Sequence, residues 1–292
     1  MLLPQFEYHE PQTLQEACEL MAELGGKAKA LAGGTDLLVN MKKKIVSPEH
    51  VVCVERLGEM KGIDVSDGAI RIGAAEKVAE IAKSEQVSSK LGALSLGAQN
   101  LGSPLVRNLA TIAGNLGSAR PAADLPPSLM AYGANVVLKK KDSDRLVKVE
   151  ELFRGPGETV IEADELIHEI LVPLPSGMYG AHYIKLGVRS ALEISIVNVA
   201  AFVQLDGDGK HIQEARVVLG SVAPTPIRAP SAESVVKGES GSPALFEKGG
   251  EAAASDAKPI DDFRASAEYR RDMVAVLTRR ALDKAYEVAV RS

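Results

Sequence analysis

Apolar residues recur along the chain at two spacings, every third or fourth residue as on one face of a helix, and every second residue as in a strand. In the N-terminal part, "KAKAL" and "HVVCVERL" are typical of strands, and "DLLVNMKKK" between them predicts a short helix. Thr13 and Glu16 have the spacing of a capping box, which predicts the start of another helix. Five apolar residues of that helix share one face: Leu14, Ala17, Cys18, Met21 and Leu24.

The pattern changes from about Val65. "AIRIGAAEKV" predicts a strand that turns at Gly73, and a helix with apolar residues at helical spacing follows it up to Leu101. "LPPSLMAYG" then predicts a short helix with prolines in its first turn, and "ANVVLKK", "RLVKVEEL" and "ELIHEILVPLP" predict three more strands. Pro173 and Pro175, followed by "SGMYGAH", indicate a domain boundary.

The last third begins with three predicted strands, "HYIKLGV", "EISIVNVAAFVQL" and "EARVVLGSV", with a turn at "DGDGK". A polar stretch rich in Ser, Gly and Ala follows, from about 231 to 257. A long helix is predicted from about Ser266 to Val290. Four residues are predicted on its apolar side: Tyr269, Met273, Val276 and Ala281.

Length and charge narrow the classes of protein to consider. A chain of 292 residues suggests two domains, or one large domain with a subdomain. The net charge of −5 gives no reason to expect nucleic acid as a partner. The N-terminus lacks the pattern of a secretory signal, and no apolar run approaches the roughly twenty residues that span a bilayer. We therefore expect a cytoplasmic protein without a transmembrane segment.

The two cysteines, Cys18 and Cys53, both fall in predicted apolar elements. We expect them to be small buried residues in a reducing compartment, without a disulfide. Two isolated cysteines cannot ligate an iron–sulfur cluster by themselves. No metal-ligand set is predicted in this chain, and the five histidines form no obvious acid–base constellation: His9, His50, His168, His182 and His211.

Two glycine-containing loops interrupt the pattern, at "ALAGGTDLLVNMKKK" and "LATIAGNLGSARPAADLPP". Adjacent glycines let a backbone approach a ligand closely and direct several N–H groups at one anion. Thr35 adds a hydroxyl to the first loop, and the second has the same parts in Thr111, Gly114 and Asn115. Two such loops could hold the two phosphates of one dinucleotide, and the alternative is that both are ordinary turns. No P-loop motif and no G-x-G-x-x-G after a strand is present, so a Rossmann domain is not expected.

Four ordered motifs, "LAGGTDLLVNMK", "NLATIAGNLGSARPAADLPPSLMA", "YIKLGVR" and "DFRASAEYRR", resemble the FAD-binding medium subunit of the molybdenum hydroxylases. That family includes carbon monoxide dehydrogenase and bacterial xanthine dehydrogenase, and the resemblance covers essentially the whole chain. It implies an α+β fold with a vanillyl-alcohol-oxidase-type (PCMH-type) FAD-binding domain at residues 1–175, with subdomains at about 1–57 and 58–175. A C-terminal domain with a three-stranded antiparallel sheet and helices is implied at 178–292.

The resemblance also implies which residues contact a non-covalently bound FAD. The first loop is expected to touch the pyrophosphate mainly through backbone N–H groups: Leu31, Ala32, Gly33, Gly34, Thr35, Asp36 and Leu37. The second loop is expected to comprise eight residues: Ala110, Thr111, Ile112, Ala113, Gly114, Asn115, Gly117 and Ser118. Leu101 and Gly102 are expected beside the flavin. Ile167 and His168 are expected on a strand that passes the isoalloxazine ring.

Asp124 and Lys185 complete the implied site. Asp124 is expected to accept hydrogen bonds at the adenosine end of FAD. Lys185 is expected near the ring, where a cation stabilises negative charge on the reduced flavin. The two side chains are therefore predicted at opposite ends of the cofactor.

Two positions depart from the family pattern. Ala113 precedes Gly114 where the family often has two glycines, which is tolerable only if Ala113 does not need a positive φ. His168 stands where an aliphatic residue is common, and the alternative for it is a simple core or edge histidine.

The implied function is that of a FAD-carrying electron-transfer subunit of an oxidoreductase complex, without catalytic side chains of its own. A molybdenum-cofactor large subunit would oxidise the substrate and a two-iron two-sulfur small subunit would relay electrons, in a dimer of heterotrimers. The acceptor stays open between NAD, a quinone, a ferredoxin and oxygen. One alternative is a self-contained flavin-dependent oxidoreductase of the same fold superfamily, and another is a non-catalytic nucleotide-binding or assembly module.

Overall fold

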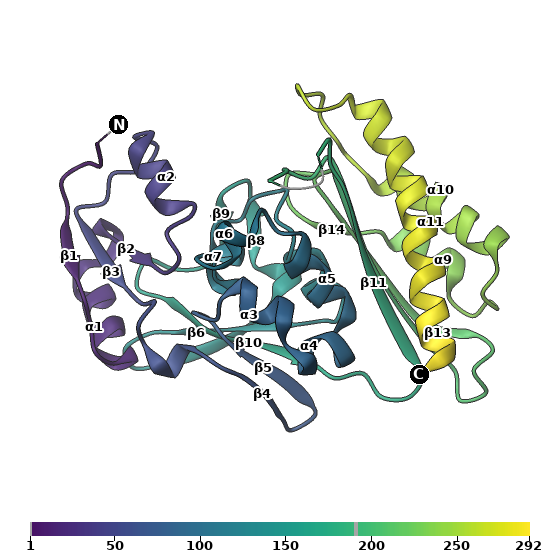
Figure 1. Ribbon diagram of the computed structural model, residues 1–292, viewed down its shortest axis with the longest axis horizontal. Coiled ribbons are helices and arrows are strands. Elements are labelled where there is room, and N and C mark those ends of the chain that lie inside the picture. Colours follow the sequence, from purple (N-terminus) through teal and green to yellow (C-terminus); the bar gives the residue numbers. More distant parts are fainter. Residues whose placement is uncertain (1, 190–191) are drawn as a thin grey trace.

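The computed structural model describes residues 2–189 and 192–292, which form three units, each built on its own sheet (Figure 1). The units follow one another along the longest axis of the molecule, from the purple N-terminal unit to the green and yellow C-terminal unit (Figure 1). None of the helices in the described part of the chain is long and apolar enough to cross a membrane.

The N-terminal unit is a three-stranded parallel sheet with the strand order β1-β3-β2. The Thr13 hydroxyl accepts a hydrogen bond from the Glu16 N–H (3.1 Å), so the first helix begins at the predicted cap. Its predicted apolar face is buried, Leu24 only partly. The elements are β1 (Glu7–His9), α1 (Leu14–Leu24), the 3₁₀ turn η1 (Gly25–Lys27), β2 (Ala28–Leu31), α2 (Leu37–Lys42) and β3 (His50–Cys53).

The middle unit is a five-stranded antiparallel sheet with the order β4-β5-β10-β6-β7. Its strands are β4 (Ile63–Ser66), β5 (Ala69–Gly73), β6 (Asn135–Lys139), β7 (Asp144–Lys148) and β10 (Leu166–Pro173), and a separate hairpin joins β8 (Phe153–Gly155) to β9 (Glu158–Thr159). The helices are η2 (Gly58–Met60), α3 (Val78–Lys83), α4 (Glu85–Lys90), α5 (Gly92–Asn100), α6 (Pro104–Arg107), α7 (Ile112–Gly117), α8 (Pro126–Ala131) and η3 (Val149–Glu151). The apolar pattern did not predict β4, three of whose four residues are exposed, or the short hairpin.

The C-terminal unit is an antiparallel sheet with the order β11-β12-β13-β14. The three predicted strands are present, and the two-residue β14 adds a fourth at the edge. The strands are β11 (Tyr179–Leu186), β12 (Val197–Leu205), β13 (Ile212–Gly220) and β14 (Ile227–Arg228), and the helices are α9 (Pro230–Val236), α10 (Pro243–Asp256) and α11 (Ala267–Arg291).

Helices α9 and α10 occupy the polar stretch to which the sequence assigned no element. The small residues there serve close helix packing: a side chain at Gly250 would overlap the backbone carbonyl of Ala275 in α11. Gly249, Gly250 and Ala253 are all buried. Glycine and serine in this stretch therefore indicate a tight helix crossing as well as a helix cap, Ser242 being the N-cap of α10.

The apolar face predicted for the last helix is wrong. Tyr269 is 44% exposed, and Met273 and Val276 are only partly buried; among the four predicted residues Ala281 alone is fully buried. The helix α11 packs directly on the backbone of β11, because a side chain at Gly180 would overlap the backbone of α11. The buried face of α11 instead combines alanines and larger apolar residues with two polar residues: Arg270, Val274, Leu277, Thr278, Ala281, Leu282, Ala285 and Ala289.

The C-terminal sheet separates two apolar cores. Tyr183 and Phe202 face the core shared with the middle unit, whereas Ile184 and Val203 face the core beneath the C-terminal helices. Because side chains alternate along β11, Tyr183 and Lys185 point the same way, toward the middle unit. The two cysteines are buried and carry free thiols.

Candidate functional site

The two glycine loops lie against each other. Gly33 has no room for a side chain, because a Cβ there would overlap the backbone of Leu109 and Ala110 at the start of the second loop. Gly34 has a φ of +70°, a left-handed conformation that favours glycine. The adjacent glycines are thus needed for the contact between the two loops and for the turn into α2.

The first loop presents unused hydrogen-bond donors. Within the described residues, none of the backbone N–H groups of Gly33 to Leu37 donates to a protein acceptor. The carbonyl of Gly34 is used, since it accepts from the Leu38 N–H at 3.1 Å. These residues are partly buried, and free N–H groups in succession form a concave site that favours an anion.

The second loop differs from the first. The Thr111 hydroxyl caps α7 by accepting from the Gly114 N–H (3.1 Å). The N–H groups of Ile112 and Ala113 donate to the carbonyls of Glu76 and Ala74. The protein itself therefore satisfies these three N–H donors of the second loop, so the two loops differ in the donors that they leave for a ligand.

The second loop instead exposes glycine backbone to solvent. Gly114 and Gly117 are exposed, and the buried Oδ1 of Asn115 has no hydrogen-bond partner in the described part of the chain. An unpartnered buried oxygen costs free energy unless a ligand or water donates to it. Ala113 has a negative φ, as the sequence required of it, because it lies in the first turn of a helix.

Arg120 links the two loops a second time. Its Nη2 donates to Asn40 Oδ1 at 3.1 Å, and its Nε lies 3.9 Å from Asp36 Oδ1. Arg120 was not among the predicted site residues, although it follows the second loop directly. A basic residue that ends a glycine loop was the available signal.

The strand β10 lies beside the second loop. Ile167 is buried, and its Cδ1 would be 3.8 Å from a Cβ on Gly117, which is ordinary contact. His168 lies at a bulge in β10, and its carbonyl accepts from the Ala74 N–H at 3.0 Å. The structure thus brings Ile167 and the backbone of His168 beside the second loop. The ring of His168 makes no hydrogen bond within the described residues.

Asp124 and Lys185 form a buried ion pair. Lys185 Nζ lies 2.9 Å from Asp124 Oδ2, and each side chain is 8% exposed. The same carboxylate accepts hydrogen bonds from the hydroxyls of Tyr183 (2.7 Å) and Ser195 (3.1 Å). Burial raises the pKa of the Asp124 carboxyl, while Lys185 and the two hydroxyls oppose that shift. Tyr183 and Ser195 were not among the predicted site residues, although Tyr183 stands two residues before Lys185 on one face of a strand.

This pair corrects the prediction that Asp124 and Lys185 lie at opposite ends of an extended ligand. Two side chains in hydrogen-bonding contact cannot lie at opposite ends of an extended ligand. Lys185 Nζ also donates to the carbonyl of Asn100 (3.0 Å), next to Leu101 and Gly102. Gly102 has a φ of +51°, and its carbonyl accepts from the Leu192 N–H. The predicted residues Leu101, Gly102, Asp124 and Lys185 therefore form one cluster.

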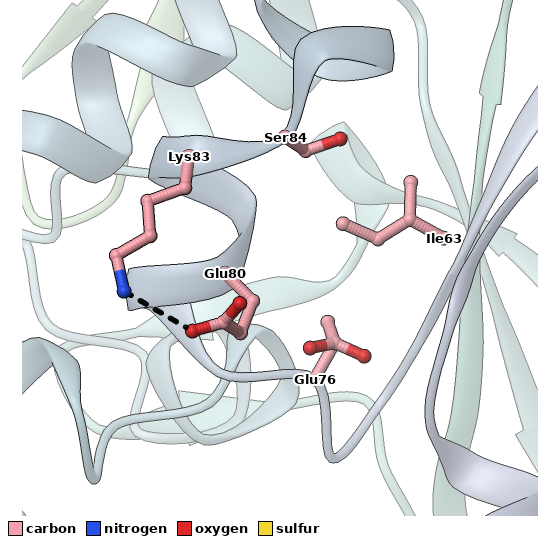
Figure 2. Close-up of a pocket in the computed structure, with 5 residues that line it drawn as sticks. All are labelled: Ile63, Glu76, Glu80, Lys83 and Ser84. Carbon is pink, nitrogen blue, oxygen red and sulfur yellow. Dashed lines mark hydrogen bonds and ion pairs between the residues drawn. The ribbon is translucent and has the colours of Figure 1, made fainter.

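A surface pocket in the middle unit lies apart from these loops. Figure 2 shows its lining residues Ile63, Glu76, Glu80, Lys83 and Ser84, with an ion pair from Lys83 to Glu80. None of the predicted site residues lines it. Only Glu76 connects it with the second loop, through the backbone hydrogen bond to Ile112.

Comparison with known proteins identifies the family to which the chain belongs. Residues 4–175 match the family model of the FAD binding domain in molybdopterin dehydrogenase, and residues 182–285 match that of the CO dehydrogenase flavoprotein C-terminal domain. The chain is 31% identical over 286 residues to the carbon monoxide dehydrogenase medium chain of Hydrogenophaga pseudoflava, covering 98% of this chain and 99% of the relative. It is 30% identical over 284 residues to the xanthine dehydrogenase FAD-binding subunit of Escherichia coli O157:H7, covering 97% of this chain and 96% of the relative.

Solved structures show the same fold. A structure of carbon monoxide dehydrogenase from Hydrogenophaga pseudoflava, lacking the Mo-pyranopterin moiety of the molybdenum cofactor, superposes with a TM-score of 0.93 and 32% identity. The match covers 98% of this chain and 99% of that chain. With both matched domains, the shared fold and relatives of nearly equal length, the chain belongs to the family of FAD-binding medium subunits of the molybdenum hydroxylases, which are oxidoreductases.

Proposed function

We propose that this chain passes electrons from a partner iron–sulfur subunit to an external acceptor by way of a non-covalently bound FAD. The proposed FAD-binding domain comprises residues 1–175, with subdomains at about 1–57 and 58–175, and the C-terminal domain comprises 178–292. When bound, FAD supplies redox chemistry that side chains lack. The residues of this chain bind it, orient it and set the charge around it.

The observation that carries the proposal is the row of N–H groups from Gly33 to Leu37, which have no acceptor among the described residues and belong to a loop that packs against the second loop. A pyrophosphate carries the charge that such a row favours, and each hydrogen bond to a charged group contributes about 1.5–3 kcal/mol. The exposed glycines of the second loop leave room for a ligand to approach, and the Asn115 amide offers an unpartnered oxygen. These features fit an extended anionic dinucleotide better than two unrelated turns.

The cluster of Asp124 and Lys185 is assigned to the flavin end of the site. Lys185 contacts the backbone beside Leu101 and Gly102, the residues expected next to the ring. Its ammonium would then face the ring, and Asp124 would hold that ammonium in place. We do not propose that Asp124 contacts the adenosine end, because its carboxylate already accepts hydrogen bonds from three donors.

The need for partners follows from the chemistry that the chain lacks. Its two cysteines are buried and too few to ligate an iron–sulfur cluster. We infer a complex with a molybdenum-cofactor large subunit and a two-iron two-sulfur small subunit, as a dimer of heterotrimers. The free thiols support a reducing compartment, and we propose the cytoplasm.

Co-purification tests this function. The tag-free chain, produced together with its partner chains, should elute as a complex whose absorption spectrum contains both flavin and iron–sulfur bands. Mass spectrometry should identify the two partner subunits. A chain that binds flavin and turns over a substrate alone would instead be a self-contained flavin oxidoreductase. A chain without flavin in any preparation would contradict the proposal.

A further inference from the structure

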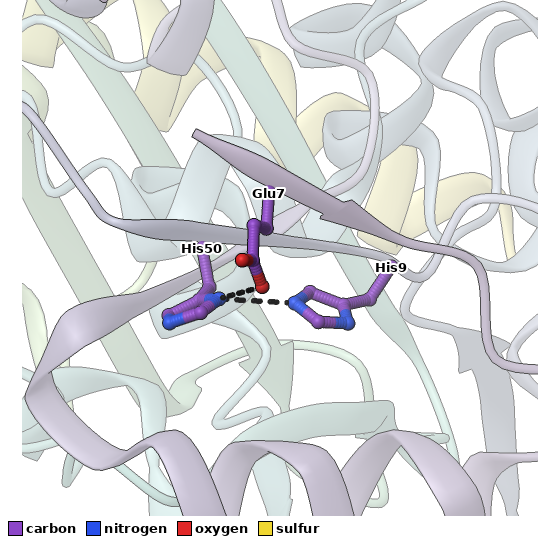
Figure 3. A group of neighbouring side chains, drawn as sticks. All are labelled: Glu7, His9 and His50. Atoms are coloured by element: carbon purple, nitrogen blue, oxygen red, sulfur yellow. Dashed lines mark hydrogen bonds and ion pairs between the residues drawn. The ribbon is translucent and has the colours of Figure 1, made fainter. Parts of the chain in front are cut away.

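Glu7, His9 and His50 lie on one face of the N-terminal sheet (Figure 3). Glu7 and His9 are two residues apart on β1, so their side chains point the same way. Parallel pairing of β1 with β3 sets Glu7 opposite His50 and His9 opposite Val52. The register therefore brings the three side chains together, although His50 is distant from Glu7 and His9 in the sequence.

Two distances between the three groups are close to those around a small metal ion, and the ligand atoms of all three lie within 4.8 Å of one another. His9 Nε2 lies 3.1 Å from His50 Nδ1, and Glu7 Oε2 lies 3.3 Å from the same nitrogen. Bonds of about 2.0–2.2 Å from Zn²⁺ to nitrogen and oxygen place tetrahedral ligand atoms roughly 3.3–3.5 Å apart. In the described part of the chain, this is the group of at least three His, Cys, Asp or Glu side chains whose ligand atoms converge in this way.

The cluster is accessible from one side. The His50 side chain is 17% exposed and the Glu7 side chain 74% exposed, while His9 is partly buried. Two imidazoles thus sit on the sheet and a carboxylate closes over them from solvent. Without an ion, one imidazole must donate a proton to the other, whereas an ion would let both facing nitrogens act as acceptors.

We propose that Glu7, His9 and His50 form a binding site for a divalent first-row cation of the Zn²⁺ type, with a fourth position open to water. Two imidazoles and one carboxylate are a ligand set that suits Zn²⁺. The ion joins the edge strand β1 to β3, which pairs with β2, the strand that leads into the first loop. Its expected effect is to stabilise the N-terminal unit, since a ligand that binds only the folded state raises stability. None of the three residues belongs to the proposed FAD site, so a result that contradicts the cation site leaves the proposed function unaffected, and the reverse also holds.

Calorimetric titration of the metal-stripped, tag-free full chain with ZnCl₂ tests the site. The wild type is expected to bind one equivalent, and Co²⁺ in place of Zn²⁺ should give the visible absorption of a tetrahedral site. His9→Gln and His50→Gln should each lower the affinity by more than the about 10- to 100-fold that loss of an outer-shell partner costs. His211→Gln is the matched control, because His211 also contacts a carboxylate, Asp206, yet belongs to a two-residue pair on the surface.

Glu7→Gln provides a variant that keeps the fold, because Glu7 is exposed. It should weaken Zn²⁺ binding while leaving the thermal midpoint of the metal-free chain unchanged. Zn²⁺ should raise the midpoint of the wild type and of His211→Gln, and should raise that of His9→Gln and His50→Gln less. Absence of a one-equivalent site in the wild type, or equal affinity in the wild type, Glu7→Gln and both histidine variants, would overturn the proposal.

Discussion

The ammonium of Lys185 lies 2.9 Å from the carboxylate of Asp124, which joins β11 of the C-terminal sheet to the segment before α8. Both side chains are buried, and Lys185 reaches past Asp124 to the carbonyl of Asn100 at the end of α5. The contact therefore connects three segments that are remote in sequence. It makes the two residues a single structural unit, in which removal of one changes the environment of the other.

Removing either member of this pair should destabilise the fold. Asp124→Asn and Lys185→Met should each cost about 3–5 kcal/mol, because each leaves a buried charge without its partner. The double variant should cost less than the sum, with a coupling of up to about 3 kcal/mol. Denaturant unfolding of the wild type, both single variants and the double variant measures this.

An exposed pair supplies the control. Lys27 and Glu49 lie 3.5 Å apart with side chains 65% and 63% exposed, so their coupling should stay below about 1 kcal/mol. Strict additivity for Asp124 and Lys185 would mean that the pair does not act as a unit.

Gly117→Ala should separate stability from cofactor binding. A Cβ at Gly117 meets only Ile167 at 3.8 Å, and its φ is not positive, so the protein has room for the methyl. Alanine in a helix is favoured over glycine by up to about 1 kcal/mol, so the thermal midpoint should not fall. If FAD approaches this exposed surface, the methyl should lower its affinity by about five- to a hundredfold through overpacking of about 1–3 kcal/mol. Unchanged FAD affinity, measured by fluorescence titration of the flavin-free chain, would remove the second loop from the site.

FAD should be bound without a covalent link. No cysteine lies in either loop, and the one histidine of the candidate site, His168, stands on β10 with its backbone held at a bulge. Acid precipitation of the purified complex should release all yellow colour into the supernatant. Colour that stays in the pellet after washing would show a covalent attachment.

Asp262 should stabilise the C-terminal unit in a pH-dependent way. The guanidinium of Arg264 holds the pKa of Asp262 well below its ordinary value, with a further contribution from the buried Arg270, whose Nη2 lies 2.7 Å from Asp262 Oδ1 as an ion pair. Arg270 in turn donates to the carbonyls of Ile196 and Ser221. Asp262→Asn should therefore cost about 1.5–3 kcal/mol at pH 7, the contribution of hydrogen bonds to charged groups.

The sign of the pH dependence follows from the lowered pKa. A carboxyl with a depressed pKa in the folded state stabilises it above the pKa of the unfolded chain, about 3.9, and loses that effect as the pH falls toward the folded value. The difference in thermal midpoint between the wild type and Asp262→Asn should be constant from pH 7 to about 5 and shrink below about 4. A difference that grows on acidification would contradict this role.

Local sequence signals predicted much of the fold. The capping box at Thr13, the alternation in the strands and the glycine pair at Gly33 each act within a few residues, and the structure places an element or a turn at each. The long helix was predicted with the wrong face, because its buried side includes the polar residues Arg270 and Thr278 beside Val274, Leu277, Leu282 and three alanines. The two polar residues interrupt the apolar pattern of that face.

Contacts between segments that are distant in the sequence were not predicted. The pairing of Asp124 with Lys185 depends on how the C-terminal sheet docks on the middle unit, and the meeting of His9 with His50 depends on the register of β1 and β3. Likewise, only the structure shows that the protein uses the N–H groups at the start of α7, whereas those of Gly33 to Leu37 have no acceptor in the described part of the chain. A glycine-rich motif alone cannot distinguish these two cases.

The flavin content of Gly34→Val tests the central claim most directly. A lost N–H contact to phosphate, about 1.5–3 kcal/mol, adds to backbone strain of about 1–3 kcal/mol for a branched residue at positive φ. Gly25→Val is the matched control, because Gly25 has a φ of +54° in the same unit with open space around it. The wild type and Gly25→Val should each contain one FAD per chain, whereas Gly34→Val should contain none and keep its C-terminal unit folded. Wild-type flavin content in Gly34→Val, or an equal loss in Gly25→Val, would show that the first loop does not hold the cofactor.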